Sequence, residues 1–506
     1  MREGGKGDRF QSGLRTDPAP LGFWVGDPSC ARREARGEEG AFALCARGER
    51  VIASRAGFGP IPLRSDCVDR GSRARGRRKL GDRLQSLREA VGAGRLRPDG
   101  VQSGPSDRFM ITYEDALERV LKSLDPVPEV SMSLTDALGC CLAEEVRARV
   151  ELPGFDTASM DGYAVRAAEV AKAGACLPCA FEVPAGGVAD RPLGAGECAR
   201  ILTGAPMPPG ADAVAMQEDA EREPDGRIRF LDGMKPWENV RFRGEDFRAG
   251  TRLLAAGQRL GAPQLALVAA AGHAEVRVHR KVRVVVMGSG DELRPPGSPL
   301  KPGEIHDSNS VLLGSLFRSA GAEVVALPIL PDRLEATIAG LESAVSMGDL
   351  VVTAGGASVG DRDFLRPAWE RLGGRLDFFR VAIKPGKPLF FGSLRGVPLL
   401  GLPGNPVSAF VTAVLIALPA LRRLQGDARV GHPIALGTLT APLSNPGDRR
   451  HFMRVILGDD GRVRSAGVQA SHILGPLAQA NGLVDVPPAT EWPAGTGVRV
   501  LRWGGG

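Results

Sequence analysis

Three glycine-containing loops within residues 347–407 constrain the fold more than any other stretch of the sequence. They lie at residues 353–363 (TAGGASVGDRD), 384–388 (KPGKP) and 401–408 (GLPGNPVS). The residues before the first loop are apolar and rich in β-branched side chains, which is typical of a buried strand. Glycines let backbone N–H groups approach a bound group closely, so such loops can hold a phosphate or another oxyanion. The stretch therefore predicts an anion-binding site at the ends of buried strands.

Strand and helix patterns alternate through residues 281–428. The predicted strands cover residues 281–287, 323–328, 350–353, 389–392 and 398–401. The predicted helices run from Asp307 to Gly321, over residues 333–346, up to Trp369 and over residues 406–424. This alternation favours a doubly wound parallel sheet with helices on both faces.

Ligands of such sheets bind beyond the carboxyl ends of the strands, where loops converge. Acidic and basic side chains of the chain fall at those ends: Glu292, Asp332, the loop at residues 355–363, Lys384 and Lys387. We therefore expect these groups to share one cleft.

The remaining segments predict smaller units around this sheet. The stretch that follows Met110 predicts a helix with Thr112 at its N-cap, and a second helix is expected over residues 134–146. Short strands are expected at residues 180–183, 197–201, 213–216 and 227–230, and again throughout residues 429–506. The interpretation is a multidomain α/β plus β protein: an elongated helical/β domain (110–152 and 246–280), an inserted β domain (153–245), the α/β domain (281–428) and a C-terminal, β-barrel-like domain (429–506).

Residues 1–109 differ in composition from the rest of the 506-residue chain. They hold 22 Lys/Arg against 14 Asp/Glu, so the net charge of +6 belongs to this Arg/Gly-rich segment. A basic arm for nucleic acid or an acidic partner is one interpretation. Stacking aromatics are sparse and the charge is mixed, which argues against nucleic acid. The preferred hypothesis is a disordered extension or an overcalled start, with Met110 as the true first residue.

Membrane, secretory and disulfide-rich classes are not favoured. No apolar run reaches the roughly 18 residues of a membrane span, and the N-terminus lacks a secretory signal. The eight cysteines are scattered, and the CxxC at Cys176–Cys179 has no second pair for zinc and no strand–CxxC–helix context for redox chemistry. We expect plain thiols and a cytoplasmic protein.

Seven short motifs follow one another along the chain: SMDGYA (159–164), TGAP (203–206), RGED (243–246), GDEL (290–293), GGASVG (355–360), KPGKP (384–388) and PGNP (403–406). In this order they resemble the MoeA family of molybdopterin molybdenumtransferases, whose animal relative is the E domain of gephyrin. The resemblance covers about four-fifths of the chain, from Met110 to the end.

The resemblance implies a fold and a reaction. An adenylylated dithiolene pterin would bind in the α/β domain, molybdate would enter the dithiolene, and AMP would leave as the phosphoanhydride is hydrolysed with help from Mg²⁺. A homodimer is implied in which the β domain of one subunit closes over the α/β domain of the other. The upstream adenylyltransferase and molybdoenzyme maturation factors are further expected partners, and neither membrane nor nucleic acid is expected.

The resemblance also carries over site residues, and their chemistry suits the reaction. Catalytic roles are expected for Asp161, Thr203, Glu292, Asp332, Asp363, Lys384 and Lys387. Substrate contacts are expected for Arg241, Asp246, Gly355, Gly356, Ser358, Gly360, Pro403 and Asn405. The lysines suit the molybdate dianion, and the tentative Mg²⁺ ligands Asp332 and Asp363 suit phosphoanhydride hydrolysis.

Some positions keep simpler alternatives or depart from the family pattern. Asp332 could cap the following helix, Asp246 could pair with Arg243, and Asp161 could serve a turn. The usual FDNSAMDG reads FDTASMDG at residues 155–162. Ala470 stands where glycine is usual, which weakens a substrate role for Ser471.

Other functions remain open. An adenylyltransferase of the same α/β family generally lacks counterparts of residues 110–280 and 429–506, which counts against that reading. A non-enzymatic pterin-binding scaffold is a second alternative, and the retained acidic residues and lysines argue against it.

Overall fold

The computed structural model describes residues 110–355 and 364–504. The predictions for residues 1–109 and for Gly356, Ser358, Gly360 and Asp363 therefore lie outside the described residues.

Helix α2 (Tyr113–Lys122) confirms the expected first helix. Thr112 occupies the N-cap, and its Oγ1 accepts a hydrogen bond of 3.1 Å from the backbone N–H of Asp115. Ala116 and Val120 are buried on one face of the helix, four residues apart. Thr112 thus sets the start of the helix. The apolar residues Ala116 and Val120 determine which side of the helix is buried.

The prediction of a second helix at residues 134–146 is wrong. The structure has β1 (Glu129–Ser133), a turn, β2 (Cys141–Leu142) and β3 (Val146–Arg147). Ser133 Oγ donates to Asp136 Oδ2 at 2.6 Å across the turn. Strand β13 (Glu275–His279) lies between β1 and β2, so pairing with a distant strand overrides the local helical preference.

Residues 157–241 form a sheet and a short ribbon. The four expected strands are present within a six-stranded sheet of order β8-β5-β7-β6-β10-β9. Its members are β5 (Gly162–Val165), β6 (Cys176–Val183), β7 (Cys198–Ile201), β8 (Ala213–Met216), β9 (Ala220–Arg222) and β10 (Arg227–Phe230). The ribbon pairs β4 (Thr157–Ala158) with β11 (Val240–Arg241). Strand β12 (Arg252–Leu254) and helix α3 (Ala262–Ala270) follow.

The α/β sheet has the order β17-β14-β18-β22-β21-β19. Its parallel strands are β14 (Arg283–Gly288), β17 (Glu323–Ala326), β18 (Leu350–Ala354) and β22 (Val397–Leu402). The expectation of a wholly parallel sheet is wrong at one edge, because β21 (Phe390–Leu394) runs antiparallel to β22 and β19 (Arg375–Phe379) antiparallel to β21. Arg395 and Gly396, both with positive φ, form the two-residue turn that makes β21 and β22 a hairpin.

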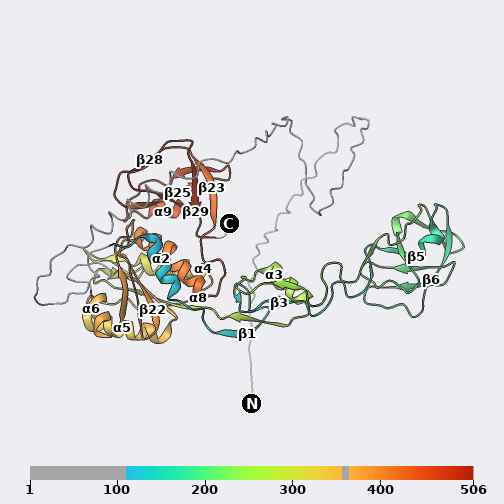
Figure 1. Ribbon diagram of the computed structural model, residues 1–506, viewed down its shortest axis with the longest axis horizontal. Coiled ribbons are helices and arrows are strands. Elements are labelled where there is room, and N and C mark those ends of the chain that lie inside the picture. The colour runs from blue at the N-terminus through green and yellow to red at the C-terminus, as the bar shows by residue number, and fades with distance from the viewer. Residues whose placement is uncertain (1–109, 356–363, 505–506) are drawn as a thin grey trace, which may run out of the picture. The chain divides into compact units, whose positions relative to one another are not determined.

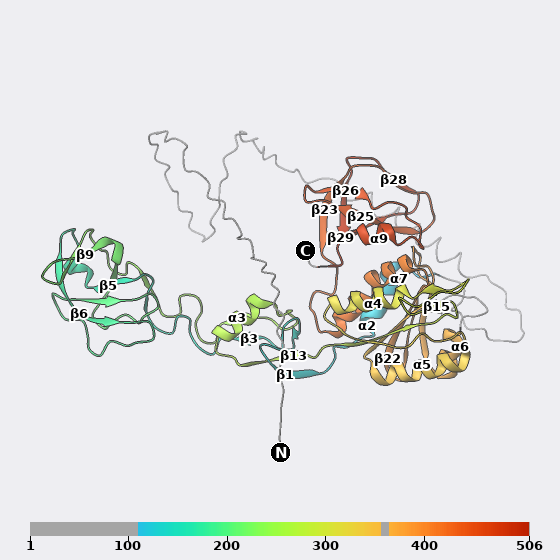
Figure 2. The same ribbon diagram turned by 180° about the vertical axis from the view of Figure 1, so that it is seen from behind.

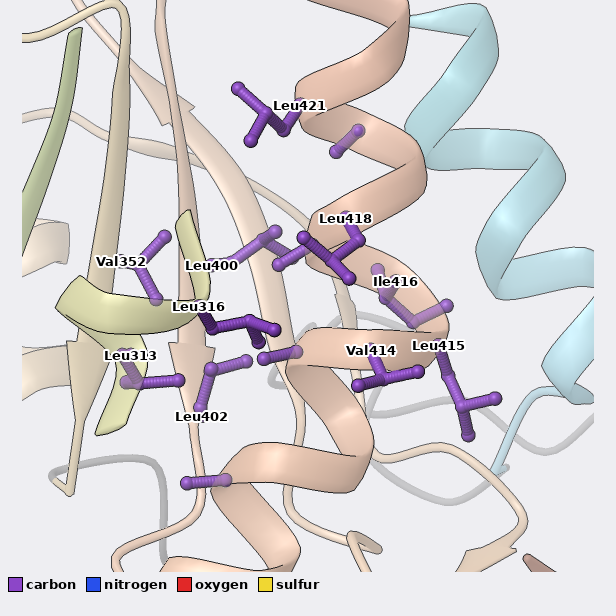
Figure 3. Packing of buried hydrophobic residues seen from close by; sticks show 14 of the residues in the cluster. Leu313, Leu316, Val352, Leu400, Leu402, Val414, Leu415, Ile416, Leu418 and Leu421 are labelled. Atoms are coloured by element: carbon purple, nitrogen blue, oxygen red, sulfur yellow. The ribbon is translucent and has the colours of Figure 1, made fainter. Parts of the chain in front are cut away.

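Helices cover both faces of this sheet (Figures 1 and 2). Helices α5 (Leu334–Met347) and α6 (Leu365–Arg371) pack on one face. Helices α4 (Ser308–Ser319), α7 (Pro406–Thr412) and α8 (Leu418–Leu424) pack on the other, with a π-helical turn at residues 413–417 joining the last two. Figure 3 shows Leu313 of α4, Leu400 of β22 and Leu418 directed toward this common core.

The helix over residues 406–424 is the one in the described part of the chain whose length and composition would suit a membrane span. Buried residues make up 89% of the window concerned, and its side chains pack against the sheet. It is therefore a core helix of this fold.

The C-terminal residues form a closed β-barrel. Strand β25 (Arg450–Leu457) pairs with both β26 and β27, and the order β25-β26-β23-β29-β27 returns to β25. The other barrel strands are β23 (Ile434–Leu439), β26 (Arg462–Ser465), β27 (Gly482–Val486) and β29 (Gly497–Leu501). The short strand β20 (Ile383–Lys384) adds to β25 from the α/β unit, with Lys384 opposite His451.

Candidate active site

A cavity of about 720 Å³ opens at the carboxyl ends of β14, β18 and β22. Loops after these strands form its wall, together with the N-termini of α4 and α7. The lining residues are Ser289, Gly290, Glu292, Leu293, Ile305, His306, Asp307, Ser308, Asn309, Asp332, Ala354, Gly355, Pro388, Pro403, Gly404, Asn405, Pro406 and His472. The sheet topology explains this position, since parallel strands bring their carboxyl ends to one edge.

Two carboxylates meet at one side of the cavity. The backbone N–H of Asp332 donates to Asp291 Oδ1 at 3.2 Å, and the N–H of Asp291 donates to Asp332 Oδ2 at 3.4 Å. Asp332 does not cap α5, because Arg333 holds the N-cap position and no side chain caps that helix. The simpler alternative for Asp332 is therefore wrong, and its carboxylate lines the cavity beside Glu292.

The loops after β18 and β22 lie against each other at the cavity floor. Gly355 has φ +91° and donates its N–H to the carbonyl of Leu402 at 3.1 Å. An added Cβ on Gly404 would lie 3.7 Å from the Cα of Gly355, so the two loops are in van der Waals contact. Asn309 of α4 donates from Nδ2 to the carbonyl of Gly404 at 2.7 Å. These contacts hold three separate chain segments at one point.

Two helix N-termini face the same cavity. Asp307 caps α4 through Oδ1, which accepts from the N–H of Ser310 at 3.0 Å, as expected from the sequence. Asn405 is the N-cap of α7, and no side chain bonds to that helix start. Helix N-termini present unsatisfied N–H groups and a partial positive charge, which favour phosphate.

The two lysines lie on a tight turn whose last residue, Pro388, lines the cavity. Lys384 and Lys387 are exposed, and neither forms an ion pair within the described part of the chain. Gly386 has φ +115°, and a Cβ there would lie 2.3 Å from Thr412 Cγ2, so the turn requires glycine. Burial lowers the pKa of the neighbouring His451 to about 4, and the charge of Lys384 acts in the same direction.

Asp161 and Thr203 are brought together in the sheet that contains β5 and β7. The backbone N–H and the Oγ1 of Thr203 both donate to Asp161 Oδ1 at 2.7 Å. The backbone hydrogen bond, followed by the hydroxyl hydrogen bond, lowers the pKa of Asp161. Gly162 is required beside it, because a Cβ would lie 1.9 Å from the carbonyl oxygen of Ala215.

Arg241 and Asp246 are both exposed. Arg241 lies on β11 opposite Thr157. Asp246 donates its backbone N–H to the carbonyl of Leu152 at 3.0 Å. The alternative prediction that Asp246 pairs with Arg243 is wrong, because the Arg243 guanidinium forms an ion pair with Glu151 instead.

The structure thus gathers some of the expected residues and leaves others apart. Five of the expected site residues that the structure describes line the cavity: Glu292, Asp332, Gly355, Pro403 and Asn405. Six others do not line it: Asp161, Thr203, Arg241, Asp246, Lys384 and Lys387.

Sequence reasoning missed several residues at the cavity. Asp291 stands within the GDEL motif and could have been paired with Asp332 on that ground. No local signal marks Asn309 or His472. Arg454 is 1% exposed and donates to the carbonyls of Val468, Ala470 and Ile473, at 2.7, 3.2 and 3.1 Å.

The segment held by Arg454 reaches the cavity. It places His472 in the cavity wall and lets Ser471 Oγ accept from Asn405 Nδ2 at 3.2 Å. The barrel thereby supplies a side chain to a site built mainly by the α/β sheet.

The described residues offer oxygen ligands at the cavity without a complete metal cluster. No group of three His, Cys, Asp or Glu side chains suitable for a metal occurs among residues 110–355 and 364–504. Asp291, Asp332 and Glu292 nevertheless supply carboxylates along this wall or beside it. One or two carboxylates completed by water and phosphate oxygens are what Mg²⁺ commonly uses.

Comparisons with protein families agree with this architecture. Family models match residues 111–272 as the MoeA N-terminal region (domain I and II), residues 285–423 as a probable molybdopterin binding domain and residues 437–503 as the MoeA C-terminal region (domain IV).

Individual relatives extend over most of the chain. Molybdopterin molybdenumtransferase 2 of Mycobacterium tuberculosis is 39% identical over 404 residues, which are 78% of this chain and 99% of the relative. The molybdopterin molybdenumtransferase of Haemophilus influenzae is 36% identical over 378 residues, which are 74% of this chain and 93% of the relative. A crystal structure of the molybdopterin biosynthesis MoeA protein from Pyrococcus horikoshii has a TM-score of 0.67 and 34% identity, and covers 78% of this chain and 100% of its own.

Proposed function

Since the chain belongs to the molybdopterin molybdenumtransferase family, we propose that it inserts molybdate into adenylylated molybdopterin and releases AMP. Its role in molybdenum cofactor biosynthesis and its class, a transferase, follow from that membership. The observation that carries the proposal is the 720 Å³ cavity, where three strand ends, two helix N-termini and carboxylates converge.

The phosphates of the substrate bind at the floor of this cavity. Gly355 and Gly404 leave the backbone open there, and the N-terminus of α7, which no side chain caps, contributes a partial positive charge. Asn309 and Asn405 orient the phosphates through side-chain amides. Gly356, Ser358 and Gly360, which follow Gly355 in the sequence, are further proposed contacts to these phosphates.

Molybdate binds at the turn that carries Lys384 and Lys387. A tetrahedral dianion needs cations that are not already neutralised, and neither lysine is ion-paired within the described chain. Pro388 joins this turn to the cavity wall, so a metal oxyanion held there lies next to the bound pterin.

Hydrolysis of the phosphoanhydride depends on the acidic side chains at the cavity. Asp332 and Asp363 would hold Mg²⁺, which would supply charge neutralisation at the phosphates. Asp291 orients Asp332 through their reciprocal hydrogen bonds, and Glu292 positions the attacking water.

Four of the residues that do not line the cavity act from a second subunit. In the proposed homodimer, Asp161, Thr203, Arg241 and Asp246 of one protomer close the cavity of its partner. The two hydrogen bonds from Thr203 favour the ionised form of Asp161. A carboxylate is suited to face a metal ion or to accept a proton. The upstream adenylyltransferase delivers the substrate, maturation factors receive the product, and the cytoplasm is the compartment.

The test is the stoichiometry of the reaction. Full-length chain is mixed with adenylylated molybdopterin, molybdate and Mg²⁺, and AMP and pterin-bound molybdenum are measured together. The proposal predicts equal amounts of both. Pterin binding without AMP release would indicate a scaffold. In a parallel reaction with ATP and free molybdopterin, adenylylation of the pterin would indicate an adenylyltransferase.

A further inference from the structure

Three cysteines gather on two neighbouring strands outside the cavity. Cys176 and Cys179 lie on β6, and Cys198 begins β7. The two strands are parallel, with Cys179 directly opposite Cys198. Neighbouring strands lie about 4.8 Å apart, which is within the Cα separation of about 4.4–6.8 Å that a disulfide spans. The register therefore brings this pair, from distant parts of the sequence, within bonding reach.

Cys179 and Cys198 share one side of the sheet. Side chains alternate along a strand, so Cys179 lies on the same face of β6 as Leu177 and Cys176 on the opposite face. Leu177 and Cys198 belong to one buried cluster. The Sγ of Cys198 lies 3.5 Å from the carbonyl oxygen of Pro178, the residue before Cys179.

The two thiols differ in access to solvent. Cys198 is 0% exposed, whereas Cys179 is exposed. Strand β10 explains the difference, because it pairs with β6 only as far as Pro178 and leaves Cys179 beyond its end. A solvent-accessible thiol thus stands directly beside a buried one.

Each thiol shifts the pKa of the other. The Cys198 side chain lowers the pKa of Cys179 to about 6, and the backbone N–H of Arg200 and the charge of Arg222 add to this. Burial and the charge of Glu182 oppose the shift. The Cys179 side chain and burial raise the pKa of Cys198. The exposed sulfur is therefore a thiolate at neutral pH and the buried sulfur keeps its proton.

We propose that Cys179 and Cys198 form a reversible oxidation site that reacts with hydroperoxides. The Cys179 thiolate attacks one peroxide oxygen, the O–O bond breaks, and the leaving hydroxide takes up the proton that Cys179 had released to solvent, giving a sulfenic acid and water. Cys198 then attacks the Cys179 sulfur, its proton leaves with the sulfenic hydroxyl as water, and the S–S bond forms. Two thiols and one hydrogen peroxide give a disulfide and two waters, and an external dithiol reverses the step.

This pairing differs from the one that the CxxC spacing suggests. Cys176 faces the other side of the strand, so it is not the resolving thiol. All five described cysteines are reduced in the structure. Cys140 and Cys141 are buried thiols with raised pKa, and they serve as internal controls.

The first test maps the disulfide in the full chain. The protein is treated with one equivalent of hydrogen peroxide at pH 7, free thiols are alkylated, and peptides are identified by mass spectrometry. We expect a Cys179–Cys198 cross-link that dithiothreitol removes, retained in Cys176→Ser. Cys198→Ala should instead hold a dimedone-reactive sulfenic acid at Cys179. A Cys176–Cys179 cross-link, or oxidation of Cys140 as fast as Cys179, would overturn the proposal.

The second test needs no variant of the buried position. The rate of Cys179 alkylation by iodoacetamide is followed against pH in the wild-type chain, and half-maximal rate is expected near pH 6. At pH 6 the rate should exceed that of free cysteine about tenfold, since the larger thiolate fraction outweighs the lower nucleophilicity. A midpoint of the alkylation rate near the pKa of free cysteine would contradict the proposed Cys179 thiolate.

Discussion

Thr203 gives two hydrogen bonds to one oxygen of Asp161, and this local geometry sets the charge of a proposed catalytic group. Neither residue reveals this from its own motif, because SMDGYA and TGAP are separated by about forty positions. The pairing arises when β5 and β7 become neighbours in the sheet. At the residue scale, motifs identify groups of interest, and strand pairing decides which of them meet.

Thr203→Val should raise the pKa of Asp161 toward its ordinary value, because the hydroxyl donor is lost while the backbone donor remains. The folded pKa of Asp161 is lowered, so its bonds stabilise the fold above the unfolded pKa of about 3.9 and are lost as pH falls through the folded value. The stability difference between wild type and variant should therefore shrink in acid. An NMR titration of the Asp161 carboxyl checks the shift, and an unchanged midpoint would refute it.

Gly386→Ala should destabilise the lysine turn. The added Cβ would lie 2.3 Å from Thr412 Cγ2 at a positive φ of +115°. Gly373→Ala is the matched control, because φ there is +74° and nothing lies within 4 Å. The free energy of unfolding should fall by about 1–3 kcal/mol more in the first variant, from overpacking. Equal losses in chemical denaturation would show that Thr412 does not constrain the turn.

At the element scale, the helices and central strands follow from hydrophobic periodicity, capping and turn residues. Asp307 and Thr112 mark helix starts in both sequence and structure. The failures have physical causes. Within residues 134–146, Cys141 and Leu142 pair with β13 and Val146 pairs with β12, which local propensity cannot anticipate. The Arg395-Gly396 turn reverses a strand that an α/β alternation assigns as parallel.

The site shows the same division between local and distant information. Sequence motifs predicted that Glu292, Asp332, Gly355, Pro403 and Asn405 lie at strand ends, and the cavity contains all five. Asn309 and His472 join them only through tertiary packing, so no local pattern marks them.

Leu418→Ala should test the core role of the helix over residues 406–424. Leu418 is 0% exposed and packs between the helix and the sheet (Figure 3). The loss of unfolding free energy should be about 2–5 kcal/mol. Leu436→Ala is the control, since that side chain is 78% exposed and its loss should cost no more than about 0.5 kcal/mol. Similar costs for both would mean that the helix is not a core element.

At the scale of the whole molecule, the proposed function needs two copies of the chain. The cavity within one protomer lacks Asp161 and Thr203 among its described lining residues. In the proposed homodimer, each protomer supplies Asp161 and Thr203 to this cavity of its partner.

Mixing inactive variants tests this arrangement. Asp161→Asn and Asp332→Asn subunits should each be inactive as homodimers. After unfolding and refolding together, half of the dimers are mixed, and each mixed dimer has one intact site. AMP release should recover to about a quarter of wild type. No recovery, despite mixed dimers detected by mass spectrometry, would place Asp161 in the cavity of its own chain or outside the reaction.

Removal of residues 1–109 is a second test at this scale. The described fold starts at residue 110, and the matched family region starts at residue 111. The shortened chain should release AMP within about twofold of the full chain, because no part of the proposed site lies upstream. A large loss of activity would show that the basic segment takes part.

The most direct measurement is single-turnover AMP release by wild type and Asp332→Asn, each saturated with adenylylated molybdopterin, with and without molybdate and Mg²⁺. The account predicts that both bind the pterin, that wild-type release requires molybdate and Mg²⁺, and that the variant is slower by about a hundredfold or more, because charge neutralisation at the phosphoanhydride is lost. Release by Asp332→Asn at the wild-type rate would contradict the assignment of this cavity as the transferase site.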